Sequence, residues 1–216
     1  MLCFLGESHA AQHLRAAAVK KKLWVINSPD KATVIFISED TPTDDNGNRQ
    51  LGKIRDLVMQ AHNSNPTAQL VLTSQVPPGF TRSLGLPKIL HQAETLRIKD
   101  AEYRADNPEY IAVGGDAQFS NDYAHYLASF GCAVLRMSWE EAEMSKIAVN
   151  MALAAQVDYA NRLSAACAKV GADWEKVCWA LAKDSRIGPH SYLTPGRWQD
   201  SKHLMRDAKT LKDMGF

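Results

Sequence analysis

The chain has 216 residues, of which 45% are hydrophobic and 23% are charged, and its formal net charge is +1. This composition is that of a globular chain with one or two domains and a buried core. The near-neutral charge excludes a global electrostatic attraction to nucleic acid or to an anionic membrane. The apolar opening 1–5 is too short for a signal-peptide core or a membrane span. The four cysteines follow no C-x-x-C spacing, so we expect reduced thiols in a cytoplasmic protein.

Short β-rich runs alternate with helical segments over the first two-thirds of the chain. Several runs, such as TVIFIS (33–38) and QLVLTS (69–74), are largely apolar, which is typical of strands covered on both faces. This alternation predicts an α/β fold with a doubly wound parallel sheet and ligands at the carboxyl ends of its strands. The predicted strands are 2–5, 23–26, 33–38, 69–73, 88–90, 110–113 and 133–136, and the predicted helices are 10–22, 51–63 and 117–130.

The sequence changes character at Ser138. Ser138 and Glu141 form an S-x-x-E capping box, which predicts a helix that starts at Trp139 and continues for ~32 residues. Such a helix would be ~48 Å long, which indicates a domain-linking or dimer-forming element. We therefore divide the chain into an N-terminal domain, 1–137, and a helical domain, 138–216.

Within the helical domain, apolar and small residues recur at steps of three and four, which predicts a stripe that faces the core. The many alanines would let another helix approach closely, so we expect a homodimer through 139–170. Asp173 is the predicted N-cap of a second helix, and Asp207 that of a terminal helix that ends at Gly215. The predicted stripe consists of Met144, Ala148, Met151, Ala155, Tyr159, Leu163, Ala166 and Val170.

Two histidines, His9 and His13, stand four residues apart on a predicted helix, a spacing that can hold a metal ion. The sequence offers no third ligand nearby and no H-E-x-x-H pattern. We therefore interpret both as solvated side chains and assign no metal.

Five segments resemble, in the same order, parts of the UDP-glucose/GDP-mannose dehydrogenase family. The resemblance implies an NAD-binding Rossmann-like domain followed by a helical, dimer-forming central domain. It also implies oxidation of the C6 alcohol of a nucleotide sugar to a carboxylate by two NAD⁺, through a thiohemiacetal and a thioester on a cysteine. The segments are VIFISEDTPTDDNGN, VLTSQVPPGFTRS, AETLRIKDAEYRADNPEYIAVGG, AEMSKIAVNMALAAQVDYANRLSAACAKVGAD with the following DSRIGPHSYLTPG, and the final Asp207.

The resemblance implies a set of catalytic residues. Lys146 and Asn150 match the family's catalytic lysine and asparagine, and their spacing places both on one helix face. Glu94 matches the glutamate of a P-E-F-L segment, and Asp207 matches the aspartate that supports the base. Without the resemblance, Lys146 and Asn150 read as a solvated helix face, Glu94 as a surface charge and Asp207 as a helix N-cap.

The resemblance also implies ligand contacts. Arg186 matches an arginine that reaches the substrate across a dimer interface, and Tyr192 and Leu193 follow it as substrate-binding positions. Thr41 and Pro42 match the loop beside the dinucleotide.

The loop 195–207, PGRWQDSKHLMRD, departs from the family pattern G-F-G-G-S-C-F-P-K-D. His203 stands at the position of the cysteine, and an imidazole cannot form the thioester that the second oxidation needs. Trp198, Asp200 and Ser201 replace glycines, which removes the close backbone approach that a glycine loop permits. Gln75 replaces the threonine of the family's S-T-V-P segment.

The dinucleotide fingerprint G-x-G-x-x-G is weakened in the stretch GESHAA (6–11). Gly6 remains and Ala11 is an accepted third residue, but Ser8 occupies the position of the second glycine. Glu7 would place a carboxylate near the diphosphate. NAD is therefore the implied cofactor on a weakened site.

The chain ends at Phe216, so we expect it to lack the family's second Rossmann-like unit. Our main interpretation is a divergent, dimeric member without four-electron activity that binds a nucleotide, a nucleotide sugar or a partner chain. The alternative is an active NAD-dependent oxidoreductase of the UDP-glucose 6-dehydrogenase type. A third hypothesis is a single hydride transfer with Lys146 and His203 as acid and base.

Overall fold

The computed structural model describes residues 1–216, which divide into two compact units, Met1–Lys146 and Ile147–Phe216. The division falls within the long helix α6 (Trp139–Lys169). The domain boundary expected from the sequence, between residues 137 and 138, lies just before this helix.

The first unit contains a seven-stranded sheet with the strand order β2-β1-β3-β4-β5-β6-β7. Neighbouring strands pair in parallel except β5 and β6, which are antiparallel. This confirms the Rossmann-like, doubly wound class, with one reversal that the sequence did not predict. The strands are β1 (Leu2–Leu5), β2 (Val25–Ile26), β3 (Val34–Ile37), β4 (Gln69–Leu72), β5 (Ile89–Gln92), β6 (Tyr110–Gly114) and β7 (Ala133–Met137).

The chain reverses its direction in the sheet across the connection between β5 and β6. This connection holds the 3-10 turn η2 (Ile98–Asp100) and helix α4 (Ala101–Asp106), which has six residues.

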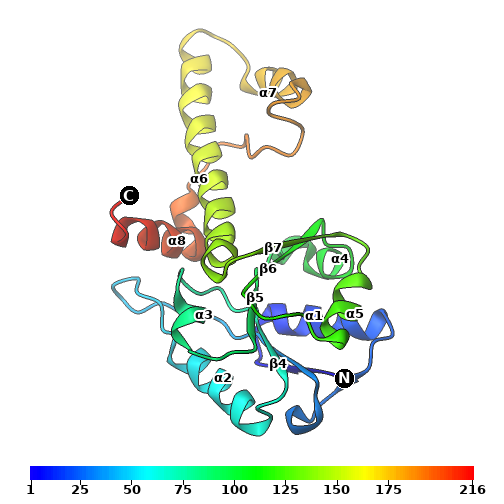
Figure 1. Cartoon of the computed structure of the whole chain (residues 1–216). Helices are drawn as coiled ribbons and strands as arrows, with labels where there is room; N and C mark the ends of the chain where they lie inside the picture. The colour runs from blue at the N-terminus through cyan, green and yellow to red at the C-terminus, as the bar shows by residue number, and fades with distance from the viewer. The chain divides into compact units, whose positions relative to one another are not determined.

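Helices cover both faces of the sheet (Figure 1). One face packs against α2 (Gly52–Ser64) and α3 (Phe80–Ser83). The other packs against α1 (His9–Lys20) and α5 (Asn121–Ala128), with α4 beside α1. The helix expected at 117–130 is shorter because Ser120 caps it, its hydroxyl accepting the Tyr123 N–H at 3.3 Å.

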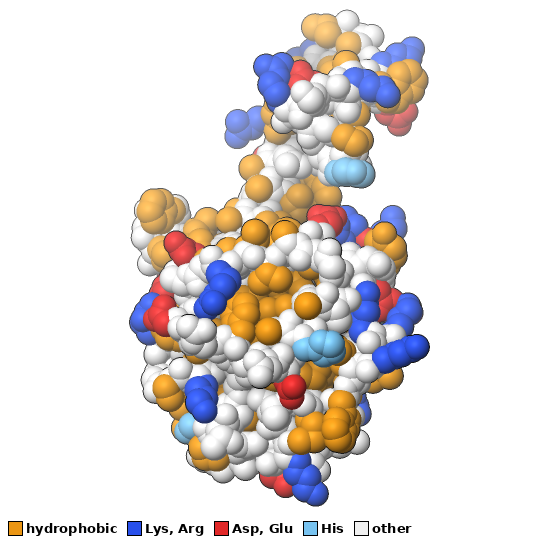
Figure 2. Space-filling view, turned by 45° about the vertical axis from the view of Figure 1, so that its right-hand side comes forward, with side chains coloured by type: hydrophobic (Ala, Val, Ile, Leu, Met, Phe, Trp, Pro, Cys, Tyr) orange, Lys and Arg blue, Asp and Glu red, His pale blue; other side chains and the backbone are white.

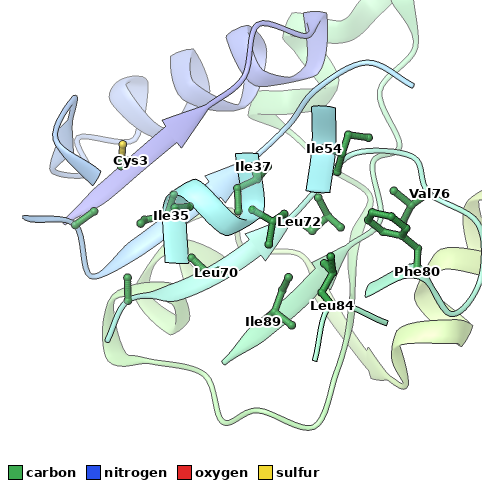
Figure 3. Close-up of a cluster of buried hydrophobic side chains, with 14 residues drawn as sticks. Cys3, Ile35, Ile37, Ile54, Leu70, Leu72, Val76, Phe80, Leu84 and Ile89 are labelled. Atoms are coloured by element: carbon green, nitrogen blue, oxygen red, sulfur yellow. The ribbon is translucent and has the colours of Figure 1, made fainter. Parts of the chain in front are cut away.

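The apolar strands explain the two cores of this unit. Side chains alternate along β3, so Ile35 and Ile37 point toward α2 (Figure 3), whereas Val34 and Phe36 point toward α5. Phe36 stacks on Phe4, with ring centroids 4.5 Å apart. A strand that is apolar on both sides thus becomes a central strand between two helical layers.

The capping box at the start of α6 is confirmed. The Ser138 N–H donates to Glu141 Oε2 at 2.7 Å, and the Glu141 N–H donates to Ser138 Oγ at 3.3 Å. No helix of the chain combines the length and apolarity that a bilayer span requires.

The second unit adds two further helices to α6. Helix α7 (Trp174–Lys183) begins at the predicted N-cap, since Asp173 accepts the Glu175 N–H at 2.9 Å. The 3-10 turn η3 (Trp198–Asp200) precedes helix α8 (Lys202–Asp213).

Two predictions for this unit are wrong. Ser201, not Asp207, caps the terminal helix, because its hydroxyl accepts the Leu204 N–H and α8 starts a turn and a half before Asp207. The predicted core stripe is also wrong: Tyr159 is 41% and Val170 80% exposed. A different face of α6 is covered, and its buried positions are Ala142, Glu143, Ile147, Asn150, Ala154 and Ala160.

Candidate functional site

Side chains at the carboxyl ends of β3, β4 and β5 form a connected network in the first unit. Arg49 donates through Nη1 to the Gln75 carbonyl oxygen at 3.0 Å, and Gln75 donates through Nε2 to Glu94 Oε2 at 3.0 Å. The Lys146 ammonium lies 4.0 Å from the same Glu94 oxygen. The structure therefore brings Glu94 and Lys146 together, as the resemblance implies, although they are 52 positions apart in the sequence.

Both oxygens of Glu94 are engaged. Oε1 accepts the Leu96 N–H, and Oε2 faces the Gln75 amide and the Lys146 ammonium. The Glu94 and Lys146 side chains are 10% and 15% exposed, so the pair is largely shielded from water. A carboxylate held this way can orient the ammonium.

Gln75 is the member of this network that the sequence analysis did not place. It counted only as the loss of a threonine, yet its amide supplies a donor to Glu94 in place of a hydroxyl. The donor capacity of a glutamine side chain beside a strand end was the available signal.

A small pocket lies beside the Glu94 segment, lined in part by Thr95, Tyr126 and Phe130. Its volume is about 30 Å³. That is room for one or two water molecules, whereas a site for a small organic ligand takes roughly 300–1,000 Å³.

In the second unit, Asn150 and Asp207 contact each other. Asn150 donates through Nδ2 to Asp207 Oδ2 at 2.6 Å, and the residues are 8% and 1% exposed. Asp207 lies in the middle of α8, where its side chain binds the amide of Asn150 on α6. The contact fixes the orientation of the Asn150 amide, as a supporting carboxylate would.

The segment 195–201, which stands where the family has its glycine loop, is hydrogen-bonded to α6. Gly196 and Asn161 exchange two hydrogen bonds of 2.8 Å, and Trp198 donates through Nε1 to Asp158 Oδ1 at 2.9 Å. His203, which follows in the first turn of α8, is exposed. We call the segment 195–201 the strap, because polar contacts hold it along the helix.

The implied substrate contacts lie in the preceding segment. Arg186 is 86% exposed and binds the carboxylate of its neighbour Asp184, at 3.0 and 2.7 Å. The bonds with Arg186 hold the pKa of Asp184 below its usual range and raise the pKa of Arg186. Tyr192 is 40% exposed, and the carbonyl oxygen of Leu193 accepts the Trp174 indole N–H at 3.0 Å.

The loop that carries the weakened fingerprint follows β1. Gly6 has φ +100°, and a Cβ there would lie 2.0 Å from the Ser38 carbonyl oxygen, so only glycine fits. Ser8 is buried and caps α1, accepting the Ala11 N–H at 3.0 Å. Its hydroxyl also donates to the Ser38 carbonyl oxygen at 2.9 Å.

Glu39, which directly follows Ser38, is a second residue of the candidate site that the sequence analysis did not single out. Its Oε2 accepts the Glu7 N–H at 3.3 Å, and the Lys53 ammonium lies 3.2 Å from the same oxygen. The residue is 9% exposed. Thr41, two residues after Glu39, is buried. Pro42 is exposed, and its carbonyl oxygen accepts the Gln50 N–H at 2.8 Å.

The two histidines on α1 touch each other at the surface, with their Nε2 atoms 3.1 Å apart. The chain contains no group of three or more His, Cys, Asp or Glu side chains that could hold a metal ion.

Comparison with known proteins relates both units to one family. The pattern described as "UDP-glucose/GDP-mannose dehydrogenase family, central domain" matches residues 140–215. The UDP-glucose 6-dehydrogenase YwqF of Bacillus subtilis (strain 168) is 30% identical over 171 residues, which cover 73% of this chain and 39% of that protein. The chain thus spans about two-fifths of that relative.

Solved structures agree on the fold. A UDP-glucose dehydrogenase from the hyperthermophilic archaeon Pyrobaculum islandicum matches with a TM-score of 0.75 at 21% identity, over 99% of this chain and 63% of that one. The 3-hydroxyisobutyrate dehydrogenase of Mycobacterium tuberculosis matches with a TM-score of 0.66 at 15% identity, over 99% of this chain and 85% of that one. With its Rossmann-like sheet and its central-domain segment, the chain is a relative of the UDP-glucose/GDP-mannose dehydrogenases.

Proposed function

We propose that this chain is a UDP-glucose/GDP-mannose dehydrogenase-like protein that binds a nucleotide sugar or a partner chain and does not catalyse the four-electron oxidation. The observation that carries the proposal is His203, which stands at the position of the cysteine, in the first turn of α8. The sulfur that would form a thioester with the substrate is replaced by an imidazole, and the strap before it is bonded to α6 through Asn161 and Asp158.

The retained polar pairs have a role in ligand binding under this proposal. Glu94 orients the Lys146 ammonium, and Asp207 orients the Asn150 amide. An ammonium and an amide donor are suited to the hydroxyl groups of a sugar, and neither contact requires a redox step.

The alternative is an active NAD-dependent oxidoreductase on the CH–OH group of a nucleotide sugar, or a single hydride transfer with Lys146 and His203 as acid and base. The Glu94–Lys146 pair favours it, because ammonium and carboxylate groups that lie side by side are the kind of groups that general acid–base catalysis uses. The presence of His203 in place of the family's cysteine argues against this alternative.

The first experiment measures thermal unfolding with UDP-glucose, GDP-mannose, NAD⁺ and NADH added singly. A ligand at 100 times its Kd adds ~2.7 kcal/mol to the free energy of unfolding, which for this size raises the midpoint by about 5–10 °C. We expect a shift with a nucleotide sugar. If none of the four ligands shifts the midpoint, nucleotide-sugar binding is refuted.

A second experiment tests the missing thiol. His203→Cys should form no uronic acid from UDP-glucose and NAD⁺, because the strap as well as the nucleophile differs from the family pattern. His203→Ser is the matched control, similar in size to cysteine but unable to form a thioester. Product with the cysteine variant alone would show that the cofactor and substrate sites are intact, and the alternative function would then hold.

We also propose a homodimer through α6 and a cytoplasmic location. The dimer is supported by apolar side chains that come to the surface of the second unit along α6 and at α7 (Figure 2). Helix α7 has no buried residue, and Trp179 on it is 65% exposed. The location is supported by the four free cysteines.

A further inference from the structure

The order in which the chain adds strands to the sheet reverses between β1 and β3, and the carboxyl ends of these two strands mark that switch point. The chain goes from β1 outward to β2 and then returns to β3 on the other side of β1. Ligands of open α/β sheets bind at this point, and a dinucleotide places its diphosphate on the N–H groups of the loop after the first strand. The loop 6–9 and the segment 38–39 occupy these ends here.

Two N–H groups at this end of the sheet, one in the loop and one in the first turn of α1, are already bonded to the protein's own side chains. The Glu7 N–H is bonded to the Glu39 carboxylate, and the Ala11 N–H is bonded to the Ser8 hydroxyl. Ser8 in turn is bonded to the Ser38 carbonyl oxygen and lies 2.8 Å from the Ser38 hydroxyl. A phosphate oxygen would have to displace these acceptors to reach the same N–H groups.

The Glu39 carboxylate is fixed in this position. Its backbone N–H donates to Ser74 Oγ at 2.8 Å, and one of its oxygens binds Lys53. The Asp40 N–H donates to the other oxygen at 3.3 Å. A negative charge that is held next to the loop repels the diphosphate.

We infer that Glu39 takes the place of the dinucleotide diphosphate, so that the loop 6–9 is closed to NAD by a carboxylate of its own chain. The residues at this end of the sheet do not fit the cofactor that the family implies. The inference goes beyond the proposed function, because it concerns the cofactor loop whether or not a nucleotide sugar binds.

The test is a calorimetric titration of the whole chain with NADH and with ADP, which measures the Kd of each ligand. We expect the wild-type chain to bind neither with a Kd below about 1 mM. Glu39→Gln keeps the size and removes the charge, and should lower both Kd values at least about tenfold. Adding Ser8→Gly, which removes the hydroxyl and its bonds, should lower them further.

The matched control is Glu7→Gln. It removes one negative charge from the loop 6–9, but the Glu7 side chain is exposed and the Glu39 carboxylate stays in place. This variant should lower the two Kd values less than Glu39→Gln does, because water and salt screen the exposed Glu7 charge. Equal gains from the two single variants would mean that net charge, not occupation of the loop by Glu39, limits binding, and would overturn the inference.

A second readout is the amide resonance of Glu7. In Glu39→Gln it should differ from that of the wild-type chain, because the Glu7 N–H loses its bond to a carboxylate, while the unfolding midpoint shows an intact fold. Tight NADH binding by the wild type, or no gain in Glu39→Gln, contradicts the inference. Because UDP-glucose is not a probe here, this outcome is independent of the nucleotide-sugar test.

Discussion

His91, on β5, is enclosed in the first unit and is 2% exposed. Burial lowers its pKa from the usual 6.5 to about 3. Between these two pH values the unfolded chain takes up a proton that the folded chain refuses. The contribution of the neutral His91 ring to the free energy of unfolding is therefore fully present above pH 6.5. It decreases by about 1.4 kcal/mol for each pH unit as the pH falls from there toward 3.

His91→Gln should remove this part of the pH dependence. Urea unfolding at pH 6 and pH 4 should show a smaller loss of stability in the variant than in the wild type, by roughly 2–3 kcal/mol. His125→Gln, at an exposed position of α5, should leave the wild-type dependence unchanged. Identical pH profiles for wild type and His91→Gln would show that the ring is not held neutral.

Residue identity predicted some local contacts and not others. Asp173 and the Ser138–Glu141 box act over three residues, so the sequence alone locates them. Asp207 and Glu39 contact residues 57 and 32 positions away. No local pattern encodes such distant partners. The sequence therefore predicted Asp207 as the N-cap of the terminal helix, although Ser201 is the N-cap.

At the scale of elements, α6 supplies a cap to another helix. The Glu143 carboxylate accepts the Gly79 N–H at 2.6 Å and the Thr81 N–H at 2.8 Å, at the start of the four-residue helix α3. The side chain is fully buried, and burial raises its pKa despite these bonds. The bonds tie α3 to the start of α6, because free N–H groups at a buried helix end are costly.

Glu143→Gln should lower the free energy of unfolding by about 1.5–3 kcal/mol, the usual range for hydrogen bonds to a charged group. The amide keeps one acceptor, so one of the two N–H groups loses its partner. Glu140→Gln on the same helix removes the exposed pair with Arg82 and should cost about 0–1 kcal/mol. Equal losses in urea unfolding would contradict the capping role.

Elements with a strong periodic or continuous apolar pattern were predictable, and short ones were not. All seven strands were found, because each is apolar over its whole length or flanked by turn residues. Helices α3 and α4 have four and six residues, too few for a helical period to show. On α6 the abundant alanines fit more than one face, so the period alone did not decide which face is covered.

At the scale of the molecule, the exposed apolar side chains of the second unit predict self-association. Tyr159→Glu places a charge on α6 at a position that is 41% exposed in the single chain. If α6 forms the dimer interface, the dimer Kd should rise at least about tenfold, since a charge buried without a partner is costly.

Sedimentation equilibrium measures this association. Val19→Glu, at a position of α1 that is 57% exposed, is the control and should leave the dimer Kd unchanged. A wild-type chain that sediments as a monomer at every concentration, or an equal effect of the two variants, would refute a dimer through α6.

The uninterrupted course of α6 restricts how the chain can vary in length. Lys146 reaches Glu94 in the first unit, and Asn150, one turn later, reaches Asp207 in the second. An inserted or deleted residue between them would change the angle about the helix axis between the two side chains by about 100°. Each pair would stay together inside its own unit, but Lys146 and Asn150 would no longer share one helix face, so changes of chain length fit loops such as 41–51 better than this stretch.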